Sequence, residues 1–177
     1  MAANQRSLSA RVRAVLLIAD ASDKAAAARA LNADWKAGTI TAVGDAPPPD
    51  RPARPPKPEL LPPKAMPKRN ARGGEAGRIA LLHALAHIEL NAIDLALDLA
   101  IRFPEDEPPR AFIDDWLSVA DDEGRHFSLL RARLKAMGSD YGALPAHDGL
   151  WAAAVESSRD IAARLAIAPM VLEARGL

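Results

Sequence analysis

The 177-residue sequence predicts an all-α protein built as a helical bundle. Hydrophobic residues make up 49% of the chain but aromatic residues only 4%, and alanine and leucine, which favour helices over sheets, supply most of the apolar content. Apolar side chains recur at helical spacing in several segments, and no segment shows the alternation of a half-buried strand. The length suits one ordinary domain with a smaller addition.

Composition also narrows the expected partners and compartment. Lysine plus arginine balances aspartate plus glutamate at 23 each, so the net charge gives no reason to expect a nucleic-acid partner. The absence of cysteine excludes disulfides and thiolate zinc sites and suits a reducing compartment. The apolar run 14–19 is too short for a signal peptide, and no run reaches the roughly 20 apolar residues that span a bilayer. We therefore expect a cytoplasmic protein without a membrane partner.

Residues 1–45 are predicted to form a small helical appendage. It contains two helices within 7–37, separated near 20–23, with Ser22 as the N-cap of the second helix and Gly38 at its end. Residues 46–73 are predicted to form an extended linker or a wrapping arm, because this basic stretch holds most of the chain's prolines. Its P-x-x-P patterns could bind a partner, but we favour a plain linker.

Residues 74–177 are predicted to form the bundle itself. A first helix is expected over 75–103 and a second over 110–137. The connection between them is short, so the two helices should pack antiparallel. A third helical pattern begins after Asp148, a candidate N-cap, and continues through Leu165.

Glu89 lies on an unexpected face of the first of these helices. A helical wheel places it at the centre of the wide apolar face, whereas a narrower polar strip carries His83, His87, Asp94 and Asp98 and is expected to face water. A buried carboxylate is costly unless it is paired, protonated or bound to a metal. Glu89 therefore needs a partner.

Glu123 repeats this anomaly at the centre of an apolar face on the second helix, and His126 lies near it one turn later. Glu89 precedes Phe103 by 14 residues and Glu123 follows Arg110 by 13. In an antiparallel pair both carboxylates are then roughly 20 Å from the turn. Two carboxylates at one height in an apolar interior cannot both ionise unless a cation lies between them.

A glutamate that faces Glu-x-x-His on the next helix is half of the ligand set of a dinuclear carboxylate bundle. Oxygen ligands with one imidazole favour iron or manganese. We interpret Glu89, Glu123 and His126 as metal ligands. The alternative is a buried hydrogen-bonded or salt-bridged polar cluster, for example with Arg125, Arg131 or Arg133, although the wheel places these arginines toward the edges or back of the helix.

His83 and His87 are spaced i and i+4 and could hold metal ligands in position through hydrogen bonds. Their strip points away from Glu89, however. We therefore favour surface or hydrogen-bonded histidines beside Asp94.

Four motifs follow one another along the chain: His87–Asp94, Asp121–Phe127, Tyr141–Trp151 and Leu172–Leu177. Together they resemble the bacterial ferritin-like family called domain of unknown function 455, from about residue 24 to the end. The resemblance implies a ferritin-like bundle with metal ligands at Glu89, Glu123, His126 and Glu173. The assignment of Glu173 rests on the resemblance alone, and an ordinary carboxylate at a helix end near Arg175 is its alternative.

The resemblance also indicates a departure from the family pattern. Family members continue past the last motif into another helix with a second Glu-x-x-His, so we expect the fourth core helix and two further ligands to be missing after Leu177, through truncation or loss. Three core helices alone would expose a face that a second copy of the chain or a partner helix could cover.

We therefore predict a carboxylate-bridged dinuclear iron or manganese protein, which when complete is an oxygen-dependent oxidase or hydroxylase of unknown substrate. The competing hypothesis is a metal-free or half-site helical module. Such a module would act as a scaffold and bind a protein partner through its open face and its basic, proline-rich arm.

Overall fold

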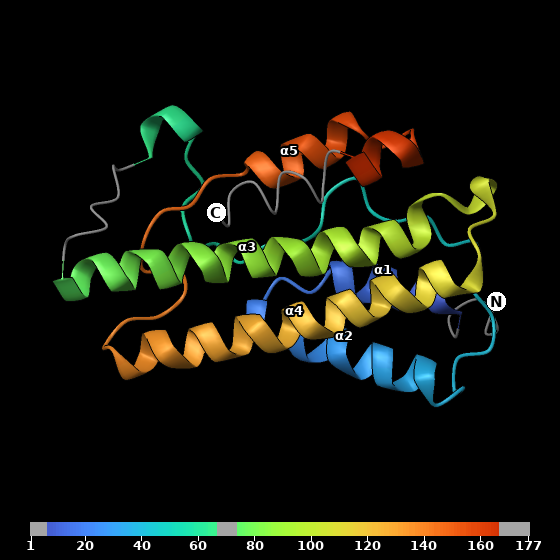
Figure 1. Ribbon diagram of the computed structural model, residues 1–177, viewed down its shortest axis with the longest axis horizontal. Helices are drawn as coiled ribbons and strands as arrows, with labels where there is room; N and C mark the ends of the chain where they lie inside the picture. The colour runs from blue at the N-terminus through green and yellow to red at the C-terminus, as the bar shows by residue number, and fades with distance from the viewer. Residues whose placement is uncertain (1–6, 67–73, 167–177) are drawn as a thin grey trace.

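The computed structural model describes residues 7–66 and 74–166. Within these ranges the regular structure is helical, with no strand and a single isolated bridge between Leu60 and Ala146, so the predicted all-α class is confirmed. The α-helices, in chain order, are α1 (Leu8–Leu16), α2 (Ala21–Lys36), α3 (Gly74–Arg102), α4 (Arg110–Ala136) and α5 (Gly149–Glu156) (Figure 1). Two short 3-10 turns are η2 (Pro63–Ala65) and η3 (Pro104–Asp106).

The helices α3 and α4 form the predicted antiparallel hairpin, with ends within about one residue of those expected. The turn between them begins at Phe103 and contains η3. Glu107, the residue that follows η3, has the left-handed conformation with φ 43°. Pro109, extended at φ −60° and ψ 150°, then precedes α4. Proline disfavours the helical conformation in the residue before it and lacks an N–H group, so the prolines of this loop separate the two helices.

The start of α2 differs from the prediction. Asp20, not Ser22, is the N-cap, and its carboxylate accepts hydrogen bonds from the backbone N–H groups of Ser22 (2.8 Å) and Asp23 (3.0 Å). A carboxylate both satisfies these N–H groups and carries the charge that favours a helix N-terminus. Gly38, with φ 71°, follows the helix end as expected.

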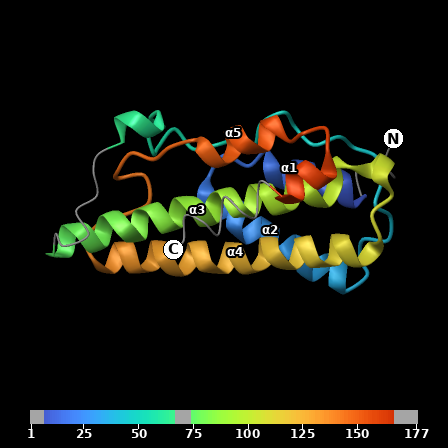
Figure 2. The same ribbon diagram turned by 45° about the horizontal axis from the view of Figure 1, so that its top comes forward.

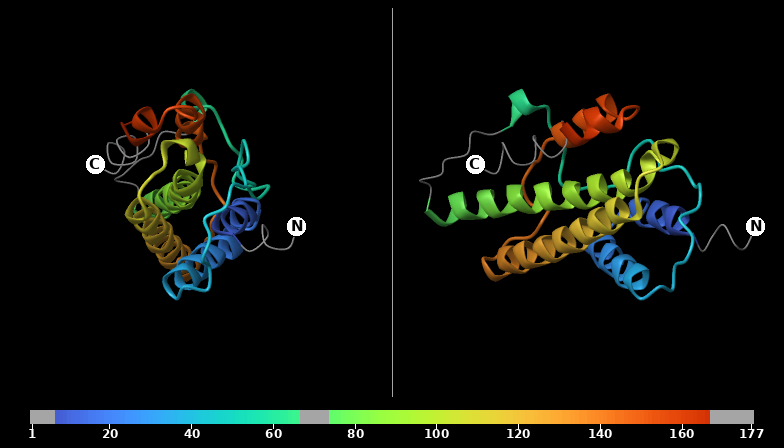
Figure 3. Two further views of the ribbon diagram at one scale, coloured as in Figure 1. Left: turned by 90° about the vertical axis from the view of Figure 1, so that its right-hand side faces the viewer. Right: turned by 45° about the vertical axis from the view of Figure 1, so that its right-hand side comes forward.

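The N-terminal helices share one hydrophobic core with the hairpin. Leu31 and Trp35 of α2 belong to the same buried cluster as Ile93 and Leu97 of α3 and Phe127 of α4. An end-on view shows α3 near the centre, with α4, the α1–α2 pair and α5 on different sides of it (Figure 3). The segment predicted as an appendage is therefore packed against the hairpin over one face.

The helices α2 and α4 approach closely at Gly124. A Cβ atom at this position would lie 2.9 Å from the backbone oxygen of Ala25 and 3.0 Å from the Cγ atom of Arg29. The absence of a side chain at Gly124 is therefore what permits this crossing.

We expect Gly124→Ala to destabilise the protein by about 1–3 kcal/mol, because the added methyl group must displace the backbone of α2. At an exposed helical position the same change would stabilise by roughly 1 kcal/mol through helix propensity. Urea unfolding followed by circular dichroism measures the difference. The matched control is Ala132→Gly at an exposed position of the same helix, which reports propensity alone. If Gly124→Ala instead raised the free energy of unfolding, α2 and α4 would have room for a methyl group between them.

The proline-rich segment is a wrapping arm rather than a free linker. It runs along the molecule from the C-terminal end of α3 back toward its N-terminal end (Figures 1 and 2). The N–H group of Ala53 donates to the carbonyl oxygen of Leu16 (2.9 Å), and the N–H group of Leu61 donates to that of Ala146 (2.8 Å). Pro52 and Pro58 are buried. The arm is thus part of the folded structure.

The polar strip of α3 is buried, so the expectation that it faces water is wrong. His83 and His87 are 2% and 6% exposed, and Asp94 and Asp98 are both 0% exposed. The reason is that α1, α2, the arm and α5 cover this side of the helix. Each aspartate is compensated by two cations, Asp94 by Lys24 and Arg54, and Asp98 by Arg102 and Arg164.

By length and composition α3 could also cross a membrane, although the sequence contains no uninterrupted apolar run of that length. More than half (56%) of its most apolar window is buried inside the protein. The core helix of a water-soluble bundle meets the same criterion, so this property does not identify a membrane span.

The third helical pattern is broken, in contrast to the prediction. The helix α5 ends at Glu156, and a second helical segment covers 161–166. Asp160 caps this segment, because its carboxylate accepts from the N–H groups of Ala162 (2.8 Å) and Ala163 (3.0 Å). Asp148 occupies the N-cap position of α5, but its carboxylate pairs with Arg51 and makes no capping hydrogen bond.

Candidate metal centre

The structure brings Glu89, Glu123 and His126 together between α3 and α4. One ligand atom from each lies within 4.8 Å of the others. The Nδ1 atom of His126 is 3.1 Å from a carboxylate oxygen of Glu123 and 3.8 Å from one of Glu89. The equal heights expected from the antiparallel register are therefore present, and the i, i+3 spacing on α4 places His126 beside Glu123.

The cluster is only partly buried. The side chains of Glu89 and Glu123 are 21% and 22% exposed, and that of His126 is 42% exposed. The prediction of carboxylates in a fully apolar interior is thus too strong, because all three side chains keep part of their surface exposed. This open side of the cluster could meet an additional ligand, a further helix or water.

The carboxyl group of Glu89 is harder to ionise than an ordinary one. Burial raises the pKa of its carboxyl group to about 8, with further contributions from a hydrogen bond to Glu123 and from the negative charge of Glu123. Within the described residues, His126 is the only basic side chain that pairs with either glutamate. Two of the arginines named for the alternative pair elsewhere, Arg131 with Asp140 (2.7 Å) and Arg125 with Asp122 (3.5 Å). Glu89, Glu123 and His126 are hydrogen-bonded to one another, so a hydrogen-bonded polar cluster stays an alternative to metal binding.

The donor set suits a metal ion. Ligand atoms bound at about 2.1 Å around one ion lie about 3 Å apart when adjacent and about 4.2 Å apart when opposite. The separations of 3.1 and 3.8 Å from His126 fall within that range. Small side-chain rotations would then bring all three groups onto one cation, which would replace the proton held by Glu89.

Without metal, the stability of the protein should fall as the pH rises from about 4.5 to about 8. In this window the unfolded state has released the proton of Glu89 but the folded state retains it, so stability decreases by about 1.4 kcal/mol per pH unit. The total effect is at most about 5 kcal/mol and is complete above pH 8. Urea unfolding at several pH values in the presence of a chelator measures it. A profile that Glu89→Gln leaves unchanged would contradict the assignment.

His83 and His87 face the loop after α4 rather than the metal cluster. The Nε2 atom of His83 accepts from the N–H group of Gly142 (2.9 Å). His87 contacts the hydroxyl group of Tyr141 through Nδ1 (2.8 Å) and the carbonyl oxygen of His147 through Nε2 (3.1 Å). Since a carbonyl only accepts, Nε2 carries the proton and Tyr141 donates to Nδ1.

Burial is the main cause that lowers the pKa of both histidines, that of His87 to about 4. Both rings are therefore neutral at physiological pH. Their described hydrogen bonds hold the loop 141–147 against α3, and none reaches Glu89, Glu123 or His126. Glu173, the remaining predicted ligand, lies outside the described residues.

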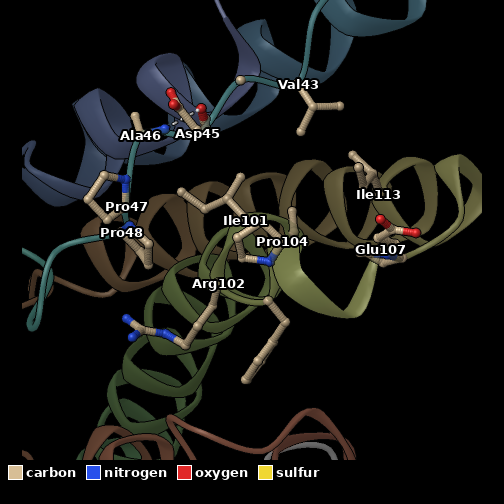
Figure 4. Close-up of a pocket in the computed structure, with 15 residues that line it drawn as sticks. Val43, Asp45, Ala46, Pro47, Pro48, Ile101, Arg102, Pro104, Glu107 and Ile113 are labelled. Carbon is tan, nitrogen blue, oxygen red and sulfur yellow. Dashed lines mark hydrogen bonds between the residues drawn. The ribbon is translucent and has the colours of Figure 1, made fainter.

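A cavity of about 360 Å³ lies between the arm and the α3–α4 turn (Figure 4). Its walls are mainly apolar and include Pro47, Pro48, Ile101 and Ile113, while the guanidinium group of Arg102 extends away from Ile113. No member of the metal cluster lines it. The cavity therefore gives no indication of a substrate for that cluster.

Comparison with known proteins identifies the family of this chain but no activity. The family described as "Protein of unknown function (DUF455)" matches residues 17–177, which confirms the resemblance to domain of unknown function 455. An uncharacterized protein of Haemophilus influenzae is 49% identical over 130 residues, which are 71% of this chain and 45% of that protein. The chain thus spans about half the length of this relative. No solved structure matches the chain.

Proposed function

Since the chain belongs to the family of domain of unknown function 455, we propose that it is a ferritin-like metal protein in which Glu89, Glu123 and His126 bind iron or manganese. The observation that carries this proposal is the convergence of two carboxylates and one imidazole from two long helices, with no lysine or arginine paired to the carboxylates within the described residues. Oxygen donors with one nitrogen donor favour these two metals.

The ferritin-like part of the proposal rests on the ligand pattern of the hairpin. One glutamate on α3 opposite Glu-x-x-His on α4 is half of the set that holds a carboxylate-bridged pair of metal ions. We propose Glu173 as a further ligand, on the family resemblance, and a second Glu-x-x-His from chain beyond Leu177. The open side of the cluster is where these groups would enter, or where a second copy or a partner helix would pack.

We propose an oxygen-dependent oxidase or hydroxylase as the activity of the complete centre. If a pair of reduced iron or manganese ions were held there, it would supply the electrons that dioxygen requires. The described residues contribute the positions of the ligands, because long packed helices hold them more rigidly than loops do. Glu89 and Glu123 contribute negative charge that favours the higher oxidation states, and His126 contributes a neutral nitrogen ligand.

The alternative is a metal-free scaffold that binds a protein through the same half-exposed face. Its support is the exposure of His126 and the incomplete ligand set. The arm contributes less to this alternative, because Arg54 pairs with the buried Asp94 and is not free to bind a partner. Arg51 pairs with Asp148 at the surface and is 49% exposed, so it could still contribute.

A metal titration separates the two functions. We expect the metal-free chain to bind Mn²⁺, or Fe²⁺ without oxygen, saturably at neutral pH, and to bind Mg²⁺ more weakly because Mg²⁺ prefers all-oxygen ligands. Isothermal titration calorimetry gives the affinity, and elemental analysis after desalting gives the stoichiometry. If neither this chain nor a version extended past Leu177 retains metal, the metal proposal is wrong and the scaffold remains.

A further inference from the structure

A second pocket lies between α5, the helical segment 161–166 and the C-terminal part of α3. It has a volume of about 200 Å³, and its lining includes Arg102, Trp151 and Arg164. Trp151 is 2% exposed and Arg164 is 1% exposed, so charged and polar groups are built into the interior at this position. Such groups are costly to bury unless they are satisfied.

The buried charges beside this pocket do not balance. Asp98, which is fully buried, accepts from both Arg102 and Arg164. Asp98, Arg102 and Arg164 together carry a net charge of +1, and Asp50, which also lines the pocket, is exposed, so water screens its negative charge. Burial, and to a smaller extent the charge of Arg102, lower the pKa of Arg164, whereas Asp98 raises it. This cluster would therefore be stabilised by one more negative charge.

Hydrogen-bond donors also remain available at the pocket. The indole Nε1 atom of Trp151 is buried and has no hydrogen-bond partner within the described residues. Arg102 donates through Nε and Nη2 to Asp98 and to the carbonyl oxygen of Pro49, which leaves its Nη1 atom without a described partner. A buried unpaired N–H group costs roughly 1–3 kcal/mol, so the indole of Trp151 favours an acceptor in the pocket. The Arg102 side chain is 14% exposed, so its Nη1 atom is a charged donor that either water or a ligand can occupy.

We propose that this pocket binds a small monocarboxylate, whose two oxygens accept from the indole of Trp151 and from the guanidinium group of Arg102. The apolar side chains of Ala154 and Val155 form part of the wall and suit a short aliphatic group. The exposed carboxylate of Asp50 also lines the pocket, and its negative charge disfavours a doubly charged anion such as phosphate more than a monoanion. A monoanion neutralises the net charge of the arginine pair.

This site is separate from the candidate metal centre. Asp98 follows Glu89 by nine residues on α3, which at about 100° per residue places the two on opposite sides of the helix. Binding in the pocket therefore needs no metal, and failure of one proposal leaves the other standing.

The test follows the indole N–H signals of the ¹⁵N-labelled protein, residues 1–177, by NMR while sodium acetate is added. Sodium chloride keeps the ionic strength constant, and Trp151→Phe identifies the signal. We expect the Trp151 signal to move downfield saturably, as a new hydrogen bond forms, while the signals of Trp35 and Trp116 stay in place. Trp35 is an internal control, because its indole already donates to Asp114.

Variants complete the test. Arg102→Gln should weaken acetate binding by roughly tenfold or more, because it removes a charge-assisted hydrogen bond. Arg11→Gln, which removes a surface ion pair with Asp34, should leave it unchanged. In the same titration, phosphate should bind more weakly than acetate. The Arg102→Gln spectrum retains the Trp151 signal, so it can be read even if Trp151→Phe does not fold.

Three results would overturn the proposal. One is a Trp151 signal that does not move with acetate, and another is a signal that moves equally with chloride. The third is a signal that is already downfield and protected from exchange before acetate is added, which would show that the protein itself supplies the acceptor.

Discussion

Glu89→Gln is expected to abolish metal binding while it stabilises the metal-free protein. The substitution keeps the size of the side chain but removes the negative charge that a metal ligand needs. Substitution of a residue that is hydrogen-bonded to a metal ligand lowers the metal affinity by about 10- to 100-fold. Loss of a ligand itself should therefore lower the metal affinity by at least about 100-fold. The same change also removes the cost of ionising a carboxyl group whose pKa is raised to about 8, so the free energy of unfolding should rise by a few kcal/mol above that pH.

The two effects are measured separately, by calorimetric titration with Mn²⁺ and by urea unfolding in a chelator. Glu75→Gln is the matched control, because Glu75 lies on the same helix and is exposed. It should change neither quantity. The opposite pair of results, unchanged metal affinity and lower stability, would identify Glu89 as a purely structural carboxylate.

Asp94→Asn is expected to cause the largest loss of stability of the substitutions considered, about 3–5 kcal/mol. Asp94 is 0% exposed and accepts from Lys24 at 2.8 Å, and one of its oxygens lies 2.8 Å from Arg54. Burial already lowers the pKa of Lys24, and Asp94 is the group that opposes this effect. An amide leaves two cations uncompensated in the interior, and it also loosens the contact of α2 and the arm with α3.

Asp34→Asn is the matched control for that experiment. Asp34 pairs with Arg11 at the surface, where its side chain is 44% exposed, so its loss should cost less than about 1 kcal/mol. Both variants are compared by urea unfolding at neutral pH. Equal stabilities of the two variants would show that the buried cluster contributes no more than a surface ion pair.

The hairpin and its cluster were predictable from the sequence because they depend on helix geometry alone. The periodicity of α3 and α4 and the length of the turn between them determine the register, and this register places Glu89 opposite Glu123. Proline and glycine likewise mark the helix ends.

The burial of the polar strip was not predictable in the same way, because it depends on partners distant in the chain. Lys24 and Arg54 lie 70 and 40 residues before Asp94, and no local pattern connects them. A wheel assigns aspartates to the water side by default, whereas tertiary contacts supply the cations that allow burial. The spacing of Asp94 and Asp98 along an otherwise apolar segment was the available signal.

The close crossing at Gly124 has a consequence for the order of folding during synthesis. The backbone of Ala25 in α2 meets Gly124 in α4, so the two halves of this contact are separated by 99 residues of chain. At the usual synthesis rates of about 5–20 residues per second, Gly124 is synthesised about 5–20 s after Ala25. The apolar face of α2 stays uncovered by α4 during this time. The N-terminal helices thus leave the ribosome before the helix that covers them is made, and their apolar faces become buried only when α4 docks against them.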